Sequence, residues 1–329
     1  MLRAILSLTA VAFTAAAPAL TAAAQTPAAP PAATGYVRPN PPGKRVQVGG
    51  GRRLHILCKG DPAPNTPTVI FEAGLSQYTA NSTNGAAQAA AVATAPGVRV
   101  CTYDRAGMGW SDAAPAGWTL EGMTADLHAL LAAEGITGRV VLVGHSFGGV
   151  LARAYVRAHP DRVAGVILVD ASSDADTAAF GAAAAAVIPQ IDQATANAAP
   201  GVPVIGLPAG TAPEVVMTFT PEILNGVKVE FEAWGRLSPA LKAPGGFGTL
   251  GDLPLIVIRR GKTAATPPNA EDIAHQQGQE SLAALSRNSV LVVAANSGHA
   301  IPLDEPQVVA DAIKRMVEAV RTGAKLGAR

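Results

Sequence analysis

Short, almost entirely apolar runs recur along the chain and are separated by longer segments in which apolar residues have helical spacing. The runs that we interpret as strands are 45–48, 53–57, 68–71, 98–103, 140–143, 163–169, 253–258 and 289–294. Residues 120–133 carry apolar side chains near helical spacing and predict an amphipathic helix. Apolar strands that alternate with helices are typical of a parallel sheet with both faces covered. We therefore expect an α/β fold with a mostly parallel, eight-stranded sheet.

The alternation of strands and helices is interrupted after Asp170. Residues 171–252 are rich in alanine and contain several prolines, and the strand pattern resumes at residue 253. Because the sheet pattern continues beyond it, we interpret this segment as an insertion and not as a second independent domain. We expect a mainly helical cap at 171–252, inserted after the sixth strand into a core formed by 44–170 and 253–329.

The first 24 residues have the pattern of an export signal. Arg3 supplies a positive charge, residues 4–20 are mostly apolar, and small residues precede Gln25. The apolar part is short for a membrane span, which needs about 20 residues, and an uncleaved anchor is the alternative interpretation. Residues 25–43 are rich in alanine and proline and predict an extended, unpacked linker. We expect an exported chain, periplasmic or secreted, with a signal peptide at 1–24 and no stable membrane span after its removal.

Composition and charge argue against several classes of partner. The chain has 329 residues, 49% of them hydrophobic, and a formal net charge of +1. Such a charge provides no field to attract nucleic acid or an anionic membrane surface, and no nucleic-acid motif is present. The sequence also shows no metal-ligand cluster and no glycine-rich phosphate loop, so we expect neither a metal nor a cofactor.

The most informative segment of the chain is Gly144-His145-Ser146-Phe147-Gly148-Gly149. It follows the apolar run 140–143 and precedes a helical stretch that begins near Val150. A strand, a Gly-x-Ser-x-Gly turn and a helix together form a sharp elbow, which exposes the serine hydroxyl above the edge of the sheet. A residue larger than glycine on either side would put its Cβ into the neighbouring strand or helix. Ser146 is therefore the candidate nucleophile.

A serine hydroxyl needs a base to remove its proton, and the base needs a partner that holds its tautomer. Of the six histidines, His299 is the best placed, because it lies in a loop directly after the last strand. His145 adjoins the serine on the elbow, where neighbouring side chains point in different directions. The others lie in the first hairpin or in predicted helices: His55, His128, His159 and His275.

Three segments, in this order along the chain, resemble the α/β-hydrolase family and its esterase-like group. Besides the elbow, residues 103–112 resemble the family's loop after the fourth strand, and residues 296–306 resemble its catalytic-histidine loop. The resemblance covers about residues 44–170 and 253–322. It implies acyl transfer from an ester, thioester or amide to the serine, without a cofactor. It also implies that Asp104 and Arg105 brace the loops and take no part in catalysis.

The resemblance leaves the acid of the triad open. The family's usual position, residues 259–263, contains no carboxylate, and the next ones are Glu271 and Asp272 at the start of a predicted helix. Acids at that place commonly serve the helix dipole. The other position used in the family is the end of the sixth strand, where Asp170 stands 24 residues after the serine, as in some haloalkane dehalogenases. We expect Asp170 to be the acid, with Glu271 or Asp272, and then Asp174, as alternatives.

Two backbone N–H groups are needed to hold the developing oxyanion. By the resemblance, one belongs to Phe147, which follows the nucleophile at the N-terminus of a helix. The other is expected from the loop after the third strand, where Leu75 is the candidate donor and Gly74 gives it room. Because the chain reads Glu72-Ala73-Gly74 where many relatives have His-Gly, a residue next to Leu75 is the alternative.

The strand order that the resemblance implies also bears on the two cysteines. In this family the second strand lies beside the fourth, which would make Cys58 and Cys101 neighbours. In an exported protein such a pair oxidises to a disulfide. Two buried free thiols are the alternative, because cysteine is common in protein cores. We favour the disulfide.

These observations predict an exported serine hydrolase, most simply a carboxylesterase that acts through an acyl-enzyme intermediate. The apolar composition of the cap predicts a small, apolar ester as substrate, although its aromatic residues could equally form the cap's own core. An aminopeptidase or amidase with the same triad is the alternative enzyme. A non-catalytic binding protein of this fold is the alternative from another class, and a turnover assay separates it from both enzymes.

Overall fold

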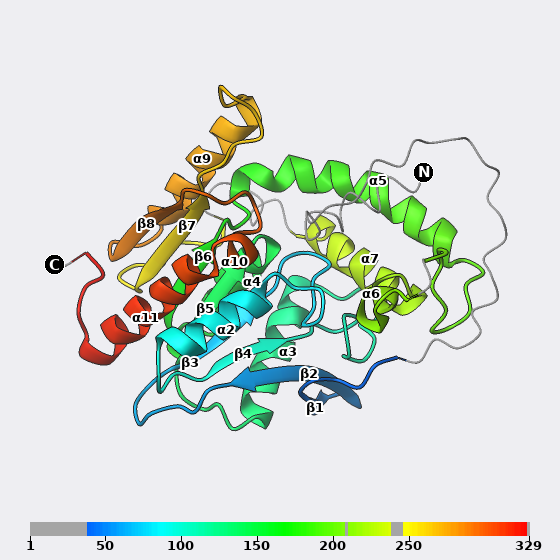
Figure 1. Cartoon of the computed structure of the whole chain (residues 1–329), viewed down its shortest axis with the longest axis horizontal. Helices are drawn as coiled ribbons and strands as arrows, with labels where there is room; N and C mark the ends of the chain where they lie inside the picture. The colour runs from blue at the N-terminus through cyan, green and yellow to red at the C-terminus, as the bar shows by residue number, and fades with distance from the viewer. Residues whose placement is uncertain (1–37, 208–209, 238–245, 328–329) are drawn as a thin grey trace.

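Eight strands form one sheet at the centre of the structure, a computed structural model that describes residues 38–207, 210–237 and 246–327 (Figure 1). The strands are β1 (Lys44–Gly49), β2 (Arg52–Lys59), β3 (Thr68–Glu72), β4 (Val100–Tyr103), β5 (Val140–His145), β6 (Val163–Val169), β7 (Leu255–Arg260) and β8 (Ser289–Ala294). Their order is β1-β2-β4-β3-β5-β6-β7-β8. β2 is antiparallel to both of its neighbours, and the other pairs are parallel. The expected mostly parallel, eight-stranded sheet is confirmed.

Helices cover both faces of this sheet (Figure 1). They are α2 (Asn84–Thr94), α3 (Leu120–Ala133), α4 (Phe147–Ala158), α9 (Ala270–Ala283), α10 (Ile301–Asp304) and α11 (Pro306–Thr322). α2 and α11 pack on one face, and α3, α4 and α9 pack on the other. In β5, Val141 and Val143 enter the first of these layers, whereas Val140 and Leu142 enter the second. The apolar run lacks polar alternation because both faces of the strand are buried.

The segment between β6 and β7 forms a helical cap, as expected for an insertion after the sixth strand. Its described helices are α5 (Thr177–Thr195), α6 (Pro213–Thr218) and α7 (Pro221–Gly235). α5 packs on α7 through a small apolar core that contains Ile191 and Phe231. α7 is also held to the core domain, because Trp234 meets the ring of Phe147 edge-on, with centroids 6.2 Å apart. The cap therefore stands over the turn that carries Ser146.

The end of the expected linker lies against the core. The Arg38 guanidinium donates a hydrogen bond to the carbonyl of Gly109, and the indole Nε1 of Trp110 donates to the carbonyl of Pro39 at 2.7 Å. The segment that includes residues 38 and 39 is therefore packed on the loop after β4, where the sequence predicted an unpacked chain. The expected signal peptide, residues 1–24, and linker residues 25–37 lie outside the described residues.

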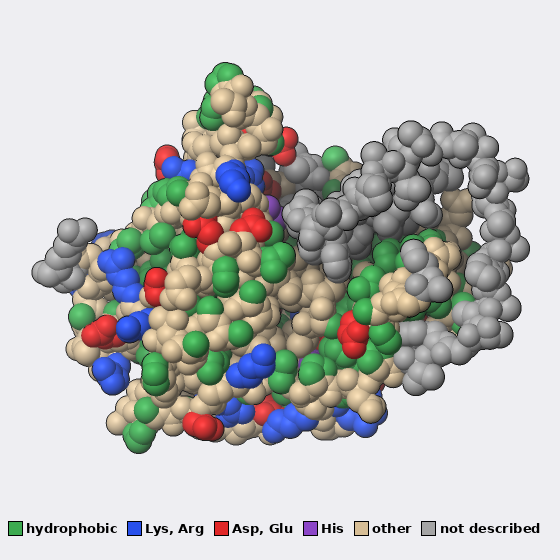
Figure 2. All heavy atoms as spheres, viewed as in Figure 1, with side chains coloured by type: hydrophobic (Ala, Val, Ile, Leu, Met, Phe, Trp, Pro, Cys, Tyr) green, Lys and Arg blue, Asp and Glu red, His purple; other side chains and the backbone are tan. Residues whose placement is uncertain are grey.

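Charges of both signs are spread over the surface. On the face shown in Figure 2, basic and acidic side chains are interspersed over the described atoms. Within the described ranges, none of the helices combines the length and the apolar character that crossing a bilayer requires.

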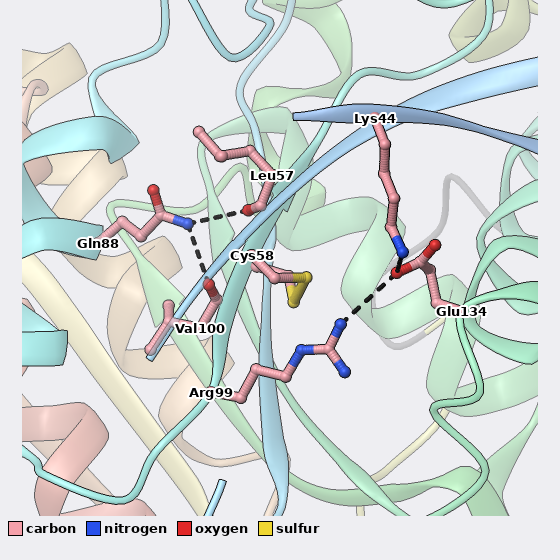
Figure 3. The surroundings of a disulfide bond; sticks show 8 residues. Lys44, Leu57, Cys58, Gln88, Arg99, Val100 and Glu134 are labelled. Carbon is pink, nitrogen blue, oxygen red and sulfur yellow. Dashed lines mark hydrogen bonds and ion pairs between the residues drawn. A yellow bond between two sulfur atoms is a disulfide. The ribbon is translucent and has the colours of Figure 1, made fainter. Parts of the chain in front are cut away.

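Cys58 and Cys101 lie opposite each other on β2 and β4, and their sulfur atoms are joined in the structure (Figure 3). The amide of Gln88, on α2, donates hydrogen bonds to Leu57 O and Val100 O, both at 3.0 Å. This side chain therefore ties together the residues that precede the two cysteines. The neighbourhood of β2 and β4, which the resemblance implied, is present in the fold.

We predict that the purified chain, denatured without reductant, contains no titratable thiol and that it shows two thiols after reduction. The bond would close a loop with a sequence separation of 43 residues. By the chain-entropy argument, such a loop stabilises the folded state by about 3–4 kcal/mol. The double variant Cys58→Ser/Cys101→Ser should therefore unfold at a clearly lower temperature. Two thiols before reduction would contradict the prediction.

Candidate active site

Ser146 occupies a strained turn between β5 and α4. Its backbone has φ 54° and ψ −122°, a conformation that costs a non-glycine residue free energy and is typical of functional sites. The flanking glycines permit it. A Cβ on Gly144 would lie 2.6 Å from the carbonyl oxygen of Gly148, and a Cβ on Gly148 would lie 2.1 Å from the carbonyl oxygen of Glu72. The close approach of the α4 start to β3 and β5 explains the sequence motif.

His299 and Asp170 meet at the edge of the sheet beside this turn. His299 lies in the loop between β8 and α10, and its Nδ1 is 2.7 Å from Asp170 Oδ2. Because a carboxylate only accepts, the proton of this hydrogen bond lies on Nδ1. The Asp170 side chain is fully buried, whereas that of His299 is 32% exposed. The pair leaves Nε2 of His299 available for a second partner, and both residues line the same pocket as Ser146.

Asp170 has two further partners that the sequence did not suggest. The backbone N–H and the guanidinium Nη1 of Arg260 each donate to the carboxylate at 3.0 Å. Nε2 of His275 lies 2.8 Å from Oδ1. Burial alone would raise the pKa of Asp170, but the hydrogen bonds from His275 and His299 outweigh it and hold this pKa well below its usual range. Asp170 is thus a carboxylate at neutral pH.

The other acids considered from the sequence have different partners. Asp272 forms the capping box of α9 with Asn269 and accepts the backbone N–H of Ala264 at 2.9 Å. Hydrogen bonds from these backbone N–H groups, that of Ala264 above all, lower its pKa against the opposing effect of burial. Asp174 pairs with Arg153 at 3.0 Å. Glu271 is exposed and lines the pocket. Among these acids, Asp170 is the one hydrogen-bonded to the histidine of the loop.

His145 supports the loop that carries His299. The sequence argument set His145 aside as the base, and the structure places its ring 4.8 Å from the ring of His299. Its Nε2–H donates to the carbonyl of His299 at 2.8 Å. Burial, and next the proximity of His299, lower the pKa of His145 to about 3, so its imidazole is neutral at physiological pH. A neutral ring that donates from Nε2 holds the backbone of the loop without adding charge.

The loop after β3 contains one backbone N–H that has no acceptor among the described residues. The N–H of Gly74 donates to the amide oxygen of Gln77 at 3.2 Å, and the N–H of Ser76 donates to Glu230 Oε2 at 2.7 Å. Between them, the N–H of Leu75 has no acceptor among the described residues. Leu75 lines the pocket beside Ser146, and Phe147 is the first residue of α4. Because the N–H groups of Gly74 and Ser76 already donate hydrogen bonds, Leu75 is favoured over these two neighbours as an oxyanion donor.

Arg105 holds the loop after β3 through hydrogen bonds to its backbone. Its Nη1 and Nη2 donate to the carbonyls of Ala73 and Gly74, both at 2.7 Å, and its Nε donates to Glu230 Oε1 at 2.6 Å. Arg105 and Glu230 are buried, and Glu230 comes from cap helix α7. Asp104, the neighbour of Arg105, accepts the backbone N–H of Trp110 at 3.0 Å. The expected bracing role of Asp104 and Arg105 is confirmed, and the contribution of the cap through Glu230 was missed.

Glu72 completes this buried cluster at the end of β3. The phenol of Tyr103 donates to both of its carboxylate oxygens, at 2.8 and 2.9 Å. Burial raises the pKa of Glu72 to about 7, against the lowering effect of the Arg105 guanidinium. Glu72 therefore belongs to the group of buried side chains that supports the loop.

The pocket in front of Ser146 has a volume of about 550 Å³. Its lining includes the apolar side chains of Leu75, Ala183 and Phe231 and the polar side chains of Asp176, Glu271 and His275. Phe231 thus serves both the pocket and the small core of the cap. In the part of the chain that the structure describes, no group of histidine, cysteine or carboxylate side chains is arranged to hold a metal ion.

Comparison with known proteins points to one family. Residues 83–312 match the model of the alpha/beta hydrolase family. A thermophilic esterase from Thermogutta terrifontis has a TM-score of 0.58 and 21% identity, over 84% of this chain and 98% of that chain. An enol-lactonase from Burkholderia xenovorans LB400 has a TM-score of 0.57 and 20% identity, over 83% of this chain and 99% of that chain. At these identities the structures show a shared fold.

Curated relatives match over shorter stretches. Lipase LipV of Mycobacterium tuberculosis is 43% identical over 76 residues, which are 23% of this chain and 28% of the relative. A putative carbamate hydrolase, RutD, of Cronobacter turicensis is 29% identical over 121 residues, which are 36% of this chain and 42% of the relative. The chain thus spans less than half the length of these relatives.

Proposed function

The chain belongs to the α/β-hydrolase family, and on this premise we propose that it is an exported serine hydrolase that cleaves carboxylic esters through an acyl-enzyme intermediate. One observation carries the proposal. The hydrogen-bonded pair of His299 and Asp170 lines the same pocket as Ser146, which stands on a strained elbow. Two of the similar proteins are an esterase and a lipase, which agrees with ester hydrolysis.

In the proposed reaction, Ser146 attacks the carbonyl carbon of the ester while Nε2 of His299 takes its proton. Asp170 holds His299 in the tautomer with the proton on Nδ1 and stabilises the imidazolium that forms. The N–H groups of Leu75 and Phe147 receive the oxyanion. His299 then protonates the departing alcohol. A water molecule, deprotonated by the same histidine, releases the acid and restores Ser146.

The side chains that line the pocket indicate the kind of substrate. The apolar side chains of Leu75, Ala183 and Phe231 suit a short or medium acyl chain, and a volume of about 550 Å³ accommodates one. The carboxylates of Asp176 and Glu271, which also line the pocket, favour an amine-bearing substrate as the second candidate, and with it an aminopeptidase. Export is supported by the pattern of residues 1–24 and by the pairing of the two cysteines, so the thiol titration also tests this part.

The test is hydrolysis of p-nitrophenyl acetate, butyrate and octanoate, with alanine p-nitroanilide as the amide. We expect turnover of the esters, with kcat/KM rising from acetate to butyrate. Each buried methylene contributes about 0.8 kcal/mol, which raises kcat/KM by up to roughly fourfold per methylene. A phosphonate ester should inactivate the enzyme and label the peptide that contains Ser146. Turnover of the anilide alone would favour the aminopeptidase. No turnover and no labelling would favour a non-catalytic binding protein.

A further inference from the structure

His275 reaches the carboxylate of Asp170 from a helix that is built against the segment around it. Three residues on one face of α9 contact this segment. Nε2 of His275 lies 2.8 Å from Asp170 Oδ1, and Nε2 of Gln279 donates to the carbonyl of Ala171 at 2.7 Å. Between them in sequence, Gly278 lies so close to Ser173 that a Cβ there would be 2.4 Å from its Oγ. Tight packing of α9 against the segment around Asp170 therefore places His275 beside the carboxylate.

The partners of Asp170 are divided evenly between its two oxygens. Oδ2 accepts from His299 at 2.7 Å and from Nη1 of Arg260 at 3.0 Å. Oδ1 accepts from His275 at 2.8 Å and from the backbone N–H of Arg260 at 3.0 Å. Two donors on each oxygen prevent rotation of the carboxylate about its Cβ–Cγ bond. If His275 were lost, Oδ1 would keep one described donor, and the plane of the carboxylate that His299 needs would be less well defined.

The nitrogen atoms used by the two histidines give them different roles. His299 contacts Asp170 through Nδ1, the ring nitrogen nearer its own backbone, so Nε2 is directed away from the carboxylate. His275 contacts Asp170 through Nε2, the far nitrogen, so its Nδ1 stays close to the backbone of α9. Only His299 therefore presents the outer nitrogen that a base for the serine needs. His275 is one-tenth exposed in the pocket, with 11% of its side chain accessible.

We propose that His275 is a positioning residue for the triad acid: its Nε2–H fixes the second oxygen of Asp170, so that the first stays aligned with Nδ1 of His299. This inference rests on the proposed function of the Ser146, His299 and Asp170 group. It assigns to a helical residue outside the triad a part in orienting the base. We expect loss of this hydrogen bond to have a measurable effect on kcat, because hydrogen bonds to a charged acceptor such as the Asp170 carboxylate are stronger than those between neutral groups.

Two substitutions separate the hydrogen bond from the packing of the side chain. His275→Leu fills similar space without a donor, and we expect kcat for p-nitrophenyl butyrate to fall about tenfold to thirtyfold with KM changed less than about twofold. His275→Gln places an amide N–H near the position of Nε2, and we expect it to restore kcat to within about threefold of the parent. A KM effect with kcat intact would overturn the proposal.

Gln279→Leu is the matched control, because it removes a buried hydrogen bond from the same face of α9 to the same segment without touching Asp170. We expect Gln279→Leu to lower the unfolding temperature about as much as His275→Leu does, with kcat within about threefold of the parent. If Gln279→Leu lowers kcat as much as His275→Leu, or if His275→Gln is as impaired as His275→Leu, the role of His275 is packing and the proposal is wrong.

A measurement without substrate keeps this proposal distinct from the hydrolase proposal. In protein labelled with nitrogen-15 histidine, the Nδ1–H of His299 should give a downfield resonance typical of an imidazole bonded to a carboxylate. We expect the resonance to be retained in His275→Gln and to shift or broaden in His275→Leu. An unchanged resonance in His275→Leu would contradict the positioning role, whatever the turnover assays show. Absence of turnover in the parent, with the expected resonances present, would reject the hydrolase proposal alone.

Discussion

Ser146→Ala is expected to reduce kcat for p-nitrophenyl butyrate by about 10⁴-fold or more, to near the uncatalysed background. The reason is that every covalent step of the proposed reaction passes through the Ser146 hydroxyl, and removal of a triad nucleophile costs about 10⁶-fold in serine proteases. Binding of the ester should be almost unchanged, because the substitution removes a single oxygen atom. Initial-rate kinetics together with phosphonate labelling measure the effect, and the variant should no longer be labelled.

The fold should tolerate this substitution, since alanine at position 146 keeps the same backbone and adds no atoms to a site with φ 54°. Ser172→Ala provides the matched control. Ser172 also lines the pocket, but its hydroxyl has no hydrogen-bond partner among the described residues. We expect Ser172→Ala to stay within about threefold of the parent. Parent-like turnover by Ser146→Ala would mean that another group performs the attack.

Asp170→Asn is expected to lower kcat by about 10⁴-fold, the size seen when the acid of a serine-protease triad loses its charge. The surroundings explain why an amide fails here. The carboxylate accepts four hydrogen bonds, from Arg260 twice, from His275 and from His299. The amide nitrogen of asparagine cannot accept a hydrogen bond. In one orientation it faces His299 and the guanidinium of Arg260, and in the other it faces His275 and the backbone N–H of Arg260. In the first orientation the proton of His299 moves to Nε2, and this nitrogen can then no longer accept the serine proton.

The alternative acids serve as controls for this prediction. Asp272→Asn removes charge from the capping box of α9, and we expect a loss of about 1 kcal/mol in the free energy of unfolding with kcat within about threefold. Glu271→Gln changes an exposed side chain of the pocket wall, and we expect less than about tenfold in kcat/KM. Kinetics of the three variants decide between the acids. If Glu271→Gln or Asp272→Asn lowered kcat as much as is expected for Asp170→Asn, the assignment of Asp170 as the triad acid would be wrong.

The outline of the fold and two members of the candidate triad could be predicted from the sequence because their signals are local. The central strands β3, β5 and β6 are buried along their whole length and read as continuous apolar runs, which made them recognisable from hydrophobicity. The elbow around Ser146 needs glycines where α4 approaches β3 and β5, and those glycines are consecutive letters in the chain. His299 was identified by its place directly after the last strand.

What only the tertiary structure decided is the set of partners of these residues. The sequence alone does not distinguish Asp170, Glu271 and Asp272 as candidate acids. In the fold they differ, because Asp170 meets His299 across 129 residues of chain whereas Asp272 caps its own helix. His275 was set aside as a helical residue, since no pattern within α9 indicates that it faces Asp170. Leu75 is favoured as the candidate oxyanion donor because the N–H groups on either side of it are already hydrogen-bonded. Periodicity is a property of neighbouring residues, whereas the protonation and orientation of a catalytic group depend on distances between segments far apart in sequence.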